Sequence, residues 1–135
     1  MLPHIFFILL VKHFLCDFAL QGRFKGPKDK YKLTSVNGHL HALDHALGTA
    51  FVFLCLSIAF YFYAGMAVFS SIILFGIMDY VLHFFIDWLK NNFVRANGYT
   101  SNMREFWILT SVDQSLHAGC YLIYTLLFSV LYGPF

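Results

Sequence analysis

The sequence predicts an all-α fold: an integral membrane four-helix bundle, with N- and C-termini on the same, non-cytoplasmic side. Composition is the first reason, because 59% of the 135 residues are hydrophobic and only 12% are charged. About a quarter of an ordinary soluble domain is charged. The second reason is that apolar residues gather into four segments, each near the ~20 residues that span a bilayer core. Backbone groups in lipid must be hydrogen-bonded internally, so these segments are predicted to be helices.

Lys12, His13 and Asp17 interrupt the first apolar segment and lower its hydropathy. It lacks a basic stretch before its apolar part, so we expect a mature helix rather than a signal peptide. The other three segments are longer and continue with few charges. A single transmembrane domain is therefore expected over residues 1–135. Its helices are predicted at about residues 2–21, 38–63, 66–90 and 106–131.

The connections between the segments differ in charge. The first, residues 22–37, holds five basic residues, and the third, residues 91–105, holds Arg95 and Arg104. The second, near Gly65, is a short uncharged turn. Short loops rich in Lys and Arg stay in the cytoplasm. The first and third loops are thus expected on the cytoplasmic side of a bacterial inner membrane.

Histidines and aspartates recur four residues apart inside the predicted helices. This spacing puts two side chains on one helix face, one turn apart. An aspartate inside a membrane costs about 2.5–3.5 kcal/mol, so such groups indicate function. Counted at 1.5 Å per residue from the basic loops, all of them fall in the cytoplasmic half. The candidate residues for one shared site are His13, Asp17, His41, His45, Asp79, His83, Asp87, Asp113 and His117.

Imidazoles and carboxylates from facing helices are the ligands that divalent metals use in helix bundles. Asp79 and Asp87 lie about 12 Å apart along one helix, so one ion cannot bind both. We therefore expect two bridged metals, or a supporting role for some of the set. Asp79 is expected as ligand or general base, and Gln21 as a catalytic donor to substrate. The mixed donor set favours zinc, with manganese or iron as alternatives.

The predicted function is a metal-dependent hydrolase that acts on a phosphoester or lipid-like substrate, since metal-bound water is a nucleophile near neutral pH. A metal-ion or proton transporter or channel is the first alternative, because it also needs intramembrane Asp and His. A non-enzymatic phage or host interaction protein, with a structural polar network, is the second. A net charge of +2 without a basic stripe gives no reason to expect nucleic acid. The sequence is compatible with a homo-oligomer.

Several further residues are weaker candidates. Asp44 precedes His45 and is a ligand, a base or a helix-entry residue. His39 lies at a helix entrance and is expected at the interface, while Gln114 is a possible donor beside Asp113. The basic first loop either attracts anionic headgroups, at about 1 kcal/mol per basic residue, or captures a phosphate-bearing substrate.

Four motifs, taken together in this order, resemble the DUF3307 family of small bacterial and phage membrane proteins. The resemblance runs from residue 13 to residue 117. It implies an inner-membrane bundle with a shared His/Asp site, and it supplies no reaction or substrate. The pattern of the motifs is also similar, more loosely, to that of membrane-bound metal-dependent hydrolases of the YdjM type. The motifs are His13-x3-Asp17-x3-Gln21, His41-x3-His45, Asp79-x3-His83-x3-Asp87-x2-Lys90 and Asp113-Gln114-x2-His117.

Overall fold

The computed structural model describes residues 2–20, 29–64 and 69–133. Within these residues the chain forms long helices and no strand, which confirms the predicted all-α fold. Four helical spans are long and apolar enough to cross a membrane, so the chain is a multi-pass membrane protein. The elements are α1 (Leu2–Phe14), the π-helix η1 (Leu15–Leu20), α2 (Val36–Ala64), α3 (Ser70–Ala96) and α4 (Arg104–Tyr132).

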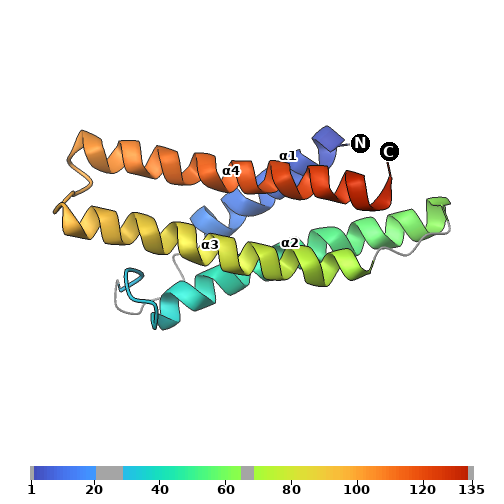
Figure 1. Ribbon diagram of the computed structural model, residues 1–135, viewed down its shortest axis with the longest axis horizontal. Coiled ribbons are helices and arrows are strands. Elements are labelled where there is room, and N and C mark those ends of the chain that lie inside the picture. The colour runs from blue at the N-terminus through green and yellow to red at the C-terminus, as the bar shows by residue number, and fades with distance from the viewer. Residues whose placement is uncertain (1, 21–28, 65–68, 134–135) are drawn as a thin grey trace.

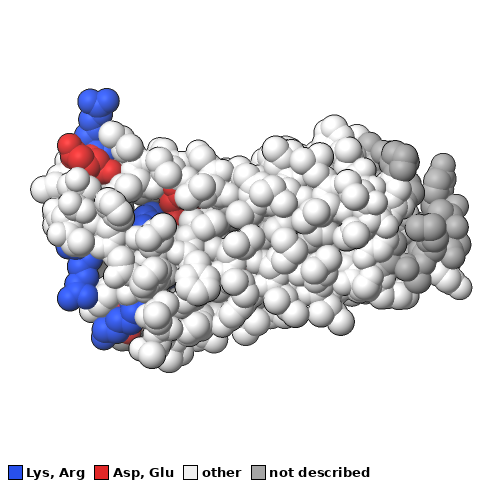
Figure 2. Space-filling model, viewed as in Figure 1, with Lys and Arg blue, Asp and Glu red and all other residues white. Residues whose placement is uncertain are grey.

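The helices lie along one another as a bundle, with both termini at the same end (Figure 1). The α3–α4 connection and the segment before α2 lie at the opposite end. Charged side chains gather at that opposite end, and the other described side chains on the visible face are uncharged (Figure 2). By the positive-inside rule, the charged end is the one predicted to face the cytoplasm. Residues 22–28 of the basic first loop and Gly65 of the predicted turn fall outside the described residues.

Helix α3 extends to Ala96, six residues beyond its predicted end at residue 90. The extension is polar, and its asparagine side chains are held by nearby carbonyls. Asn92 Nδ2 donates to Trp88 O and to Tyr31 O, at 2.9 and 2.8 Å. The helix stops at Gly98, whose φ of 66° is the left-handed conformation that glycine adopts readily. The prediction ended too early because hydropathy marks the edge of the membrane and not the end of the helix.

The interior of the bundle has an apolar half and a polar half. The apolar half, nearer the termini, holds stacked aromatic rings such as Phe53 and Phe75, whose centroids are 4.3 Å apart. Large apolar side chains also cover the outside, as lipid contact requires. The polar half begins at Lys12, whose stem packs on Gly48. A Cβ atom at Gly48 would lie 2.7 Å from Lys12 Cδ, so glycine makes room for the lysine.

Candidate metal centre

Five histidine side chains meet inside the polar half of the bundle, and none is more than 2% exposed. They come from all four helices, so the helix pairs spaced four apart converge as predicted. The His83 ring stacks between His45 and His117, with centroid separations of 3.6 and 4.1 Å. A cluster of imidazoles this dense is unusual without a bound ligand, because histidine is the commonest metal ligand. The five are His13, His41, His45, His83 and His117.

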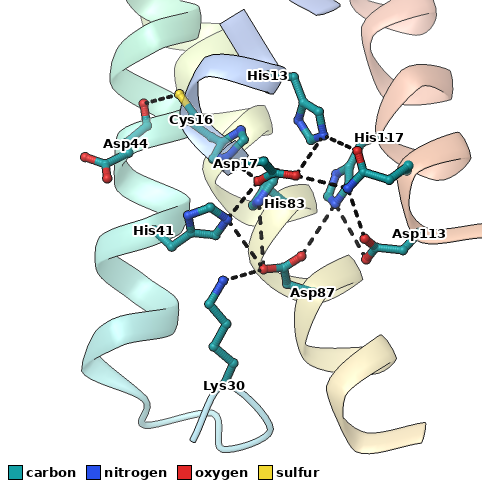
Figure 3. Close-up of polar contacts among 12 residues, drawn as sticks. His13, Cys16, Asp17, Lys30, His41, Asp44, His83, Asp87, Asp113 and His117 are labelled. Atoms are coloured by element: carbon teal, nitrogen blue, oxygen red, sulfur yellow. Dashed lines mark hydrogen bonds and ion pairs between the residues drawn. The ribbon is translucent and has the colours of Figure 1, made fainter. Parts of the chain in front are cut away.

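Asp17 lies among these rings and contacts three of them (Figure 3). Its Oδ1 is 3.1 Å from Nε2 of both His41 and His45. Its Oδ2 is 3.2 Å from His13 Nε2. Asp17 is carried by the π-helix η1, a wider helical turn that is frequent at functional sites. Sequence periodicity gives no sign of such a turn.

Asp87 and Asp113 complete the cluster on the side of the charged end. Asp87 Oδ2 lies 3.7 Å from His41 Nε2 and 3.9 Å from His83 Nε2. His117 Nε2 lies 3.6 Å from Asp87 Oδ1 and 3.8 Å from Asp113 Oδ1. These separations are too long for hydrogen bonds. They are close to the roughly 3.4 Å that separates two ligands of a tetrahedral zinc ion with bonds of about 2.1 Å.

Many ring nitrogens of the cluster have no hydrogen-bond partner among the described residues. Both ring nitrogens of His83 and His41 are in this state, as are Nδ1 of His45 and Nε2 of His117. Each buried polar atom left unsatisfied costs about 1–3 kcal/mol. Six such atoms lie on four rings of one cluster, and bound metal ions would coordinate one nitrogen lone pair from each ring.

His13 differs from the other histidines because both of its nitrogens are occupied. Gln114 Oε1, which can only accept, lies 3.1 Å from His13 Nε2, so that nitrogen carries the proton. His13 Nδ1 then accepts from the Tyr121 hydroxyl at 3.1 Å, and Lys12 Nζ donates to the same hydroxyl oxygen at 3.0 Å. Gln114 Nε2 donates to Asp17 Oδ2 at 3.0 Å. This chain of donors fixes the orientation of both His13 and Asp17.

Three overlapping groups have ligand atoms that all lie within 4.8 Å of one another. His83 belongs to two of the groups, and His117 also belongs to two. The first and third groups share no residue, so their ligand atoms form two separate sets. The groups are Asp17, His41, His45 and His83; then His13, His83 and His117; then Asp87, Asp113 and His117.

Two lysines bind the outer carboxylates. Lys30 Nζ lies 3.0 Å from Asp87 Oδ2, and Lys90 Nζ lies 2.9 Å from Asp113 Oδ2. Each ammonium balances part of the negative charge of the cluster. Both lysines therefore lie close to any anion that enters the site.

Asp79 does not join these groups, although the sequence analysis expects it as ligand or base. Its Oδ2 accepts hydrogen bonds from Lys12 Nζ at 2.7 Å and from Thr49 Oγ1 at 2.6 Å. Asp79 lies one helical turn before His83, on the side of the apolar core, where Lys12 reaches it. The contacts therefore indicate a buried ion pair. Lys12 had no predicted role, although a lysine within an apolar helix is expected to pair with a carboxylate or a backbone carbonyl.

The weaker candidates are mostly outside the cluster. Gln21 lies outside the described residues. Asp44 is absent from the metal-compatible groups, and its backbone carbonyl accepts from Cys16 Sγ at 3.7 Å. His39 stacks on Phe84 at 4.2 Å, near the start of α2. Gln114 is the exception, because it links His13 to Asp17.

Comparison with curated proteins and with solved structures finds no match. The looser similarity to hydrolases of the YdjM type gains no support from these comparisons. A family model does match residues 5–132, nearly the whole chain. Its description is "Protein of unknown function", so it carries no activity over to this chain. The chain therefore belongs to the DUF3307 family.

Proposed function

We propose that this protein is a membrane-embedded, metal-dependent hydrolase with two ions in its His/Asp cluster, acting on a phosphoester of a lipid-like substrate. One observation carries the proposal: buried ring nitrogens of His41, His45, His83 and His117 lack hydrogen-bond partners within the described residues. Nε2 of His41 and Nε2 of His117 lie 3.7 and 3.6 Å from oxygens of Asp87, separations that suit a metal ion better than a hydrogen bond. Zinc matches this imidazole and carboxylate set best.

The two disjoint groups suggest different roles for the two ions. The group around Asp17 offers four ligands, which is the closed arrangement of a structural zinc site. The group of Asp87, Asp113 and His117 offers three, which leaves a coordination position open, as in catalytic zinc sites. A divalent ion held by these three residues would supply Lewis acidity and a bound water acidified to near neutral pH.

The chain's own residues contribute binding and positioning. Lys30 and Lys90 lie beside the outer carboxylates and can each hold a phosphate oxygen. His13 and Gln114 hold Asp17 in place through their hydrogen bonds. Residues that orient a ligand in this way often change metal affinity 10–100-fold when mutated.

The apolar half favours a hydrolase over an ion transporter. Beyond Asp79, much of the interior is filled by the packed rings of Phe53, Phe75 and Phe128. The hydroxyl groups of Ser57 and Thr125 in this half donate to carbonyls of their own helices. An ion that crossed the membrane would meet little polar lining there.

Metal analysis of protein purified in detergent tests the proposal. We expect two zinc ions per chain, and loss of at least one ion in His83→Ala. His4→Ala is the matched control, because His4 is exposed near the opposite end of the bundle. A content below one ion per chain that His83→Ala leaves unchanged would contradict the proposal. Hydrolysis of a lipid phosphoester should then depend on the bound zinc.

A further inference from the structure

A groove of about 190 Å³ runs between α3 and α4 on the outside of the bundle. Its lining is apolar except for Lys90 and Asp113. The apolar lining side chains Leu89, Val112 and Leu116 are each about half exposed, so the groove opens toward the surrounding lipid. An acyl chain is the natural occupant of an apolar groove within a bilayer.

The inner wall of the groove belongs to the candidate metal centre. Asp113 is 2% exposed and lies in the group with Asp87 and His117. Its Oδ1 has no hydrogen-bond partner among the described residues and lies 3.8 Å from His117 Nε2. Asp113 therefore belongs both to the wall of the groove and to the three-ligand group.

The charges along the groove favour an anionic headgroup. Lys90 Nζ is bound to Asp113 at 2.9 Å, and its side chain is 22% exposed. A divalent ion on Asp113 would compete for the same carboxylate and release the Lys90 ammonium. A second hollow on α4 shares Val112 and Leu116 with the groove and has Arg104 at its charged end. Two cations therefore flank the level at which a headgroup would lie.

We propose that this groove binds one anionic phospholipid of the bilayer, with an acyl chain between α3 and α4 and its phosphate on Lys90. The lipid's headgroup is then held beside Asp113 and His117. Its role as substrate rests on the function proposed above, whereas its binding does not. Lysine stems lie along apolar surface while their ammonium groups reach the headgroups, which is the geometry that Lys90 offers.

Native mass spectrometry of the full chain tests this binding, with dimyristoyl phosphatidylglycerol and dimyristoyl phosphatidylcholine as probes. We expect one retained phosphatidylglycerol per chain, preferred about fivefold over phosphatidylcholine, the size typical of one lysine near an anionic lipid. Lys90→Met should remove the preference, and Leu116→Trp should remove retention by filling the groove. Lys32→Met and Leu126→Trp are matched controls, because both side chains are exposed and neither lines the groove.

Zinc content is measured on the same samples, so the two proposals can fail separately. Retention in Leu116→Trp, or equal loss of preference in Lys32→Met, would overturn the groove proposal even if zinc is bound. Retention that depends on Lys90 and Leu116 in a protein without zinc would support the groove and count against the hydrolase. Circular dichroism confirms that each variant keeps its helices.

Discussion

Replacing Lys12 by methionine removes one partner of the most deeply buried lysine–carboxylate pair among the described residues. The Lys12 and Asp79 side chains are 8% and 3% exposed, and their charged atoms are 2.7 Å apart. The methionine keeps most of the apolar stem that packs on Gly48. Its loss of charge leaves the Asp79 carboxylate with Thr49 alone among its observed partners.

The expected loss in free energy of unfolding depends on which buried charge each variant leaves without its partner. Breaking a buried pair by removing one partner costs about 3–5 kcal/mol. The same range applies to Asp79→Asn, which leaves the Lys12 ammonium without its counter-charge. Protonation of an isolated carboxylate limits the cost, because the group becomes neutral. The double variant buries no unpaired charge and should lose much less, with a coupling energy of about 3 kcal/mol.

The assay is a double-mutant cycle on the free energy of unfolding in detergent micelles, together with zinc content. Asp79→Asn should destabilise the fold, and adding Lys12→Met should restore much of the stability. Zinc content should stay unchanged in the double variant, because neither residue belongs to the metal-compatible groups. Additive losses of stability would refute the ion-pair assignment. Loss of zinc from a folded double variant would restore the sequence-based role of Asp79 as a ligand.

Four further predictions concern the packing, the hydrogen bonds and the proposed bound ions. Gly48→Ala should lower the unfolding free energy by about 1–3 kcal/mol, because its Cβ would press on Lys12. Gly119→Ala, which meets nothing within 4 Å, should stabilise its helix by about 0.5–1 kcal/mol in the same assay. Gln114→Leu should weaken zinc binding about 10–100-fold in a chelator competition, since it no longer holds Asp17 and His13. Chelator treatment should lower the melting temperature, because an ion present at 100 times its dissociation constant adds about 2.7 kcal/mol to the free energy of unfolding. An unchanged melting temperature would argue against a resident ion.

The sequence predicted the helices and much of the cluster because both depend on local spacing. Four-residue spacing places His41 and His45 on one face, and a count of 1.5 Å per residue places them at the depth of Asp17. Neither argument gives the rotation of one helix about its axis relative to another. Asp79 shares a helix face with His83 and Asp87, yet its neighbour across the bundle is Lys12. Lys12 was considered only as a charged residue that lowers the hydropathy of its segment. The Lys12–Asp79 pair was therefore not predicted.

Charge balance explains why such a cluster would accept a phosphate. The cluster holds the three carboxylates of Asp17, Asp87 and Asp113, and the ammonium groups of Lys30 and Lys90 bind the last two. This leaves about one excess negative charge, which divalent cations would offset. Two such ions bring four positive charges, so the loaded cluster would carry a clear positive excess in a medium of low dielectric constant. Charge of one sign in a low-dielectric site attracts the opposite sign strongly. An anionic substrate is therefore favoured over a neutral one, and the lysines beside the outer carboxylates lie where its oxygens would arrive.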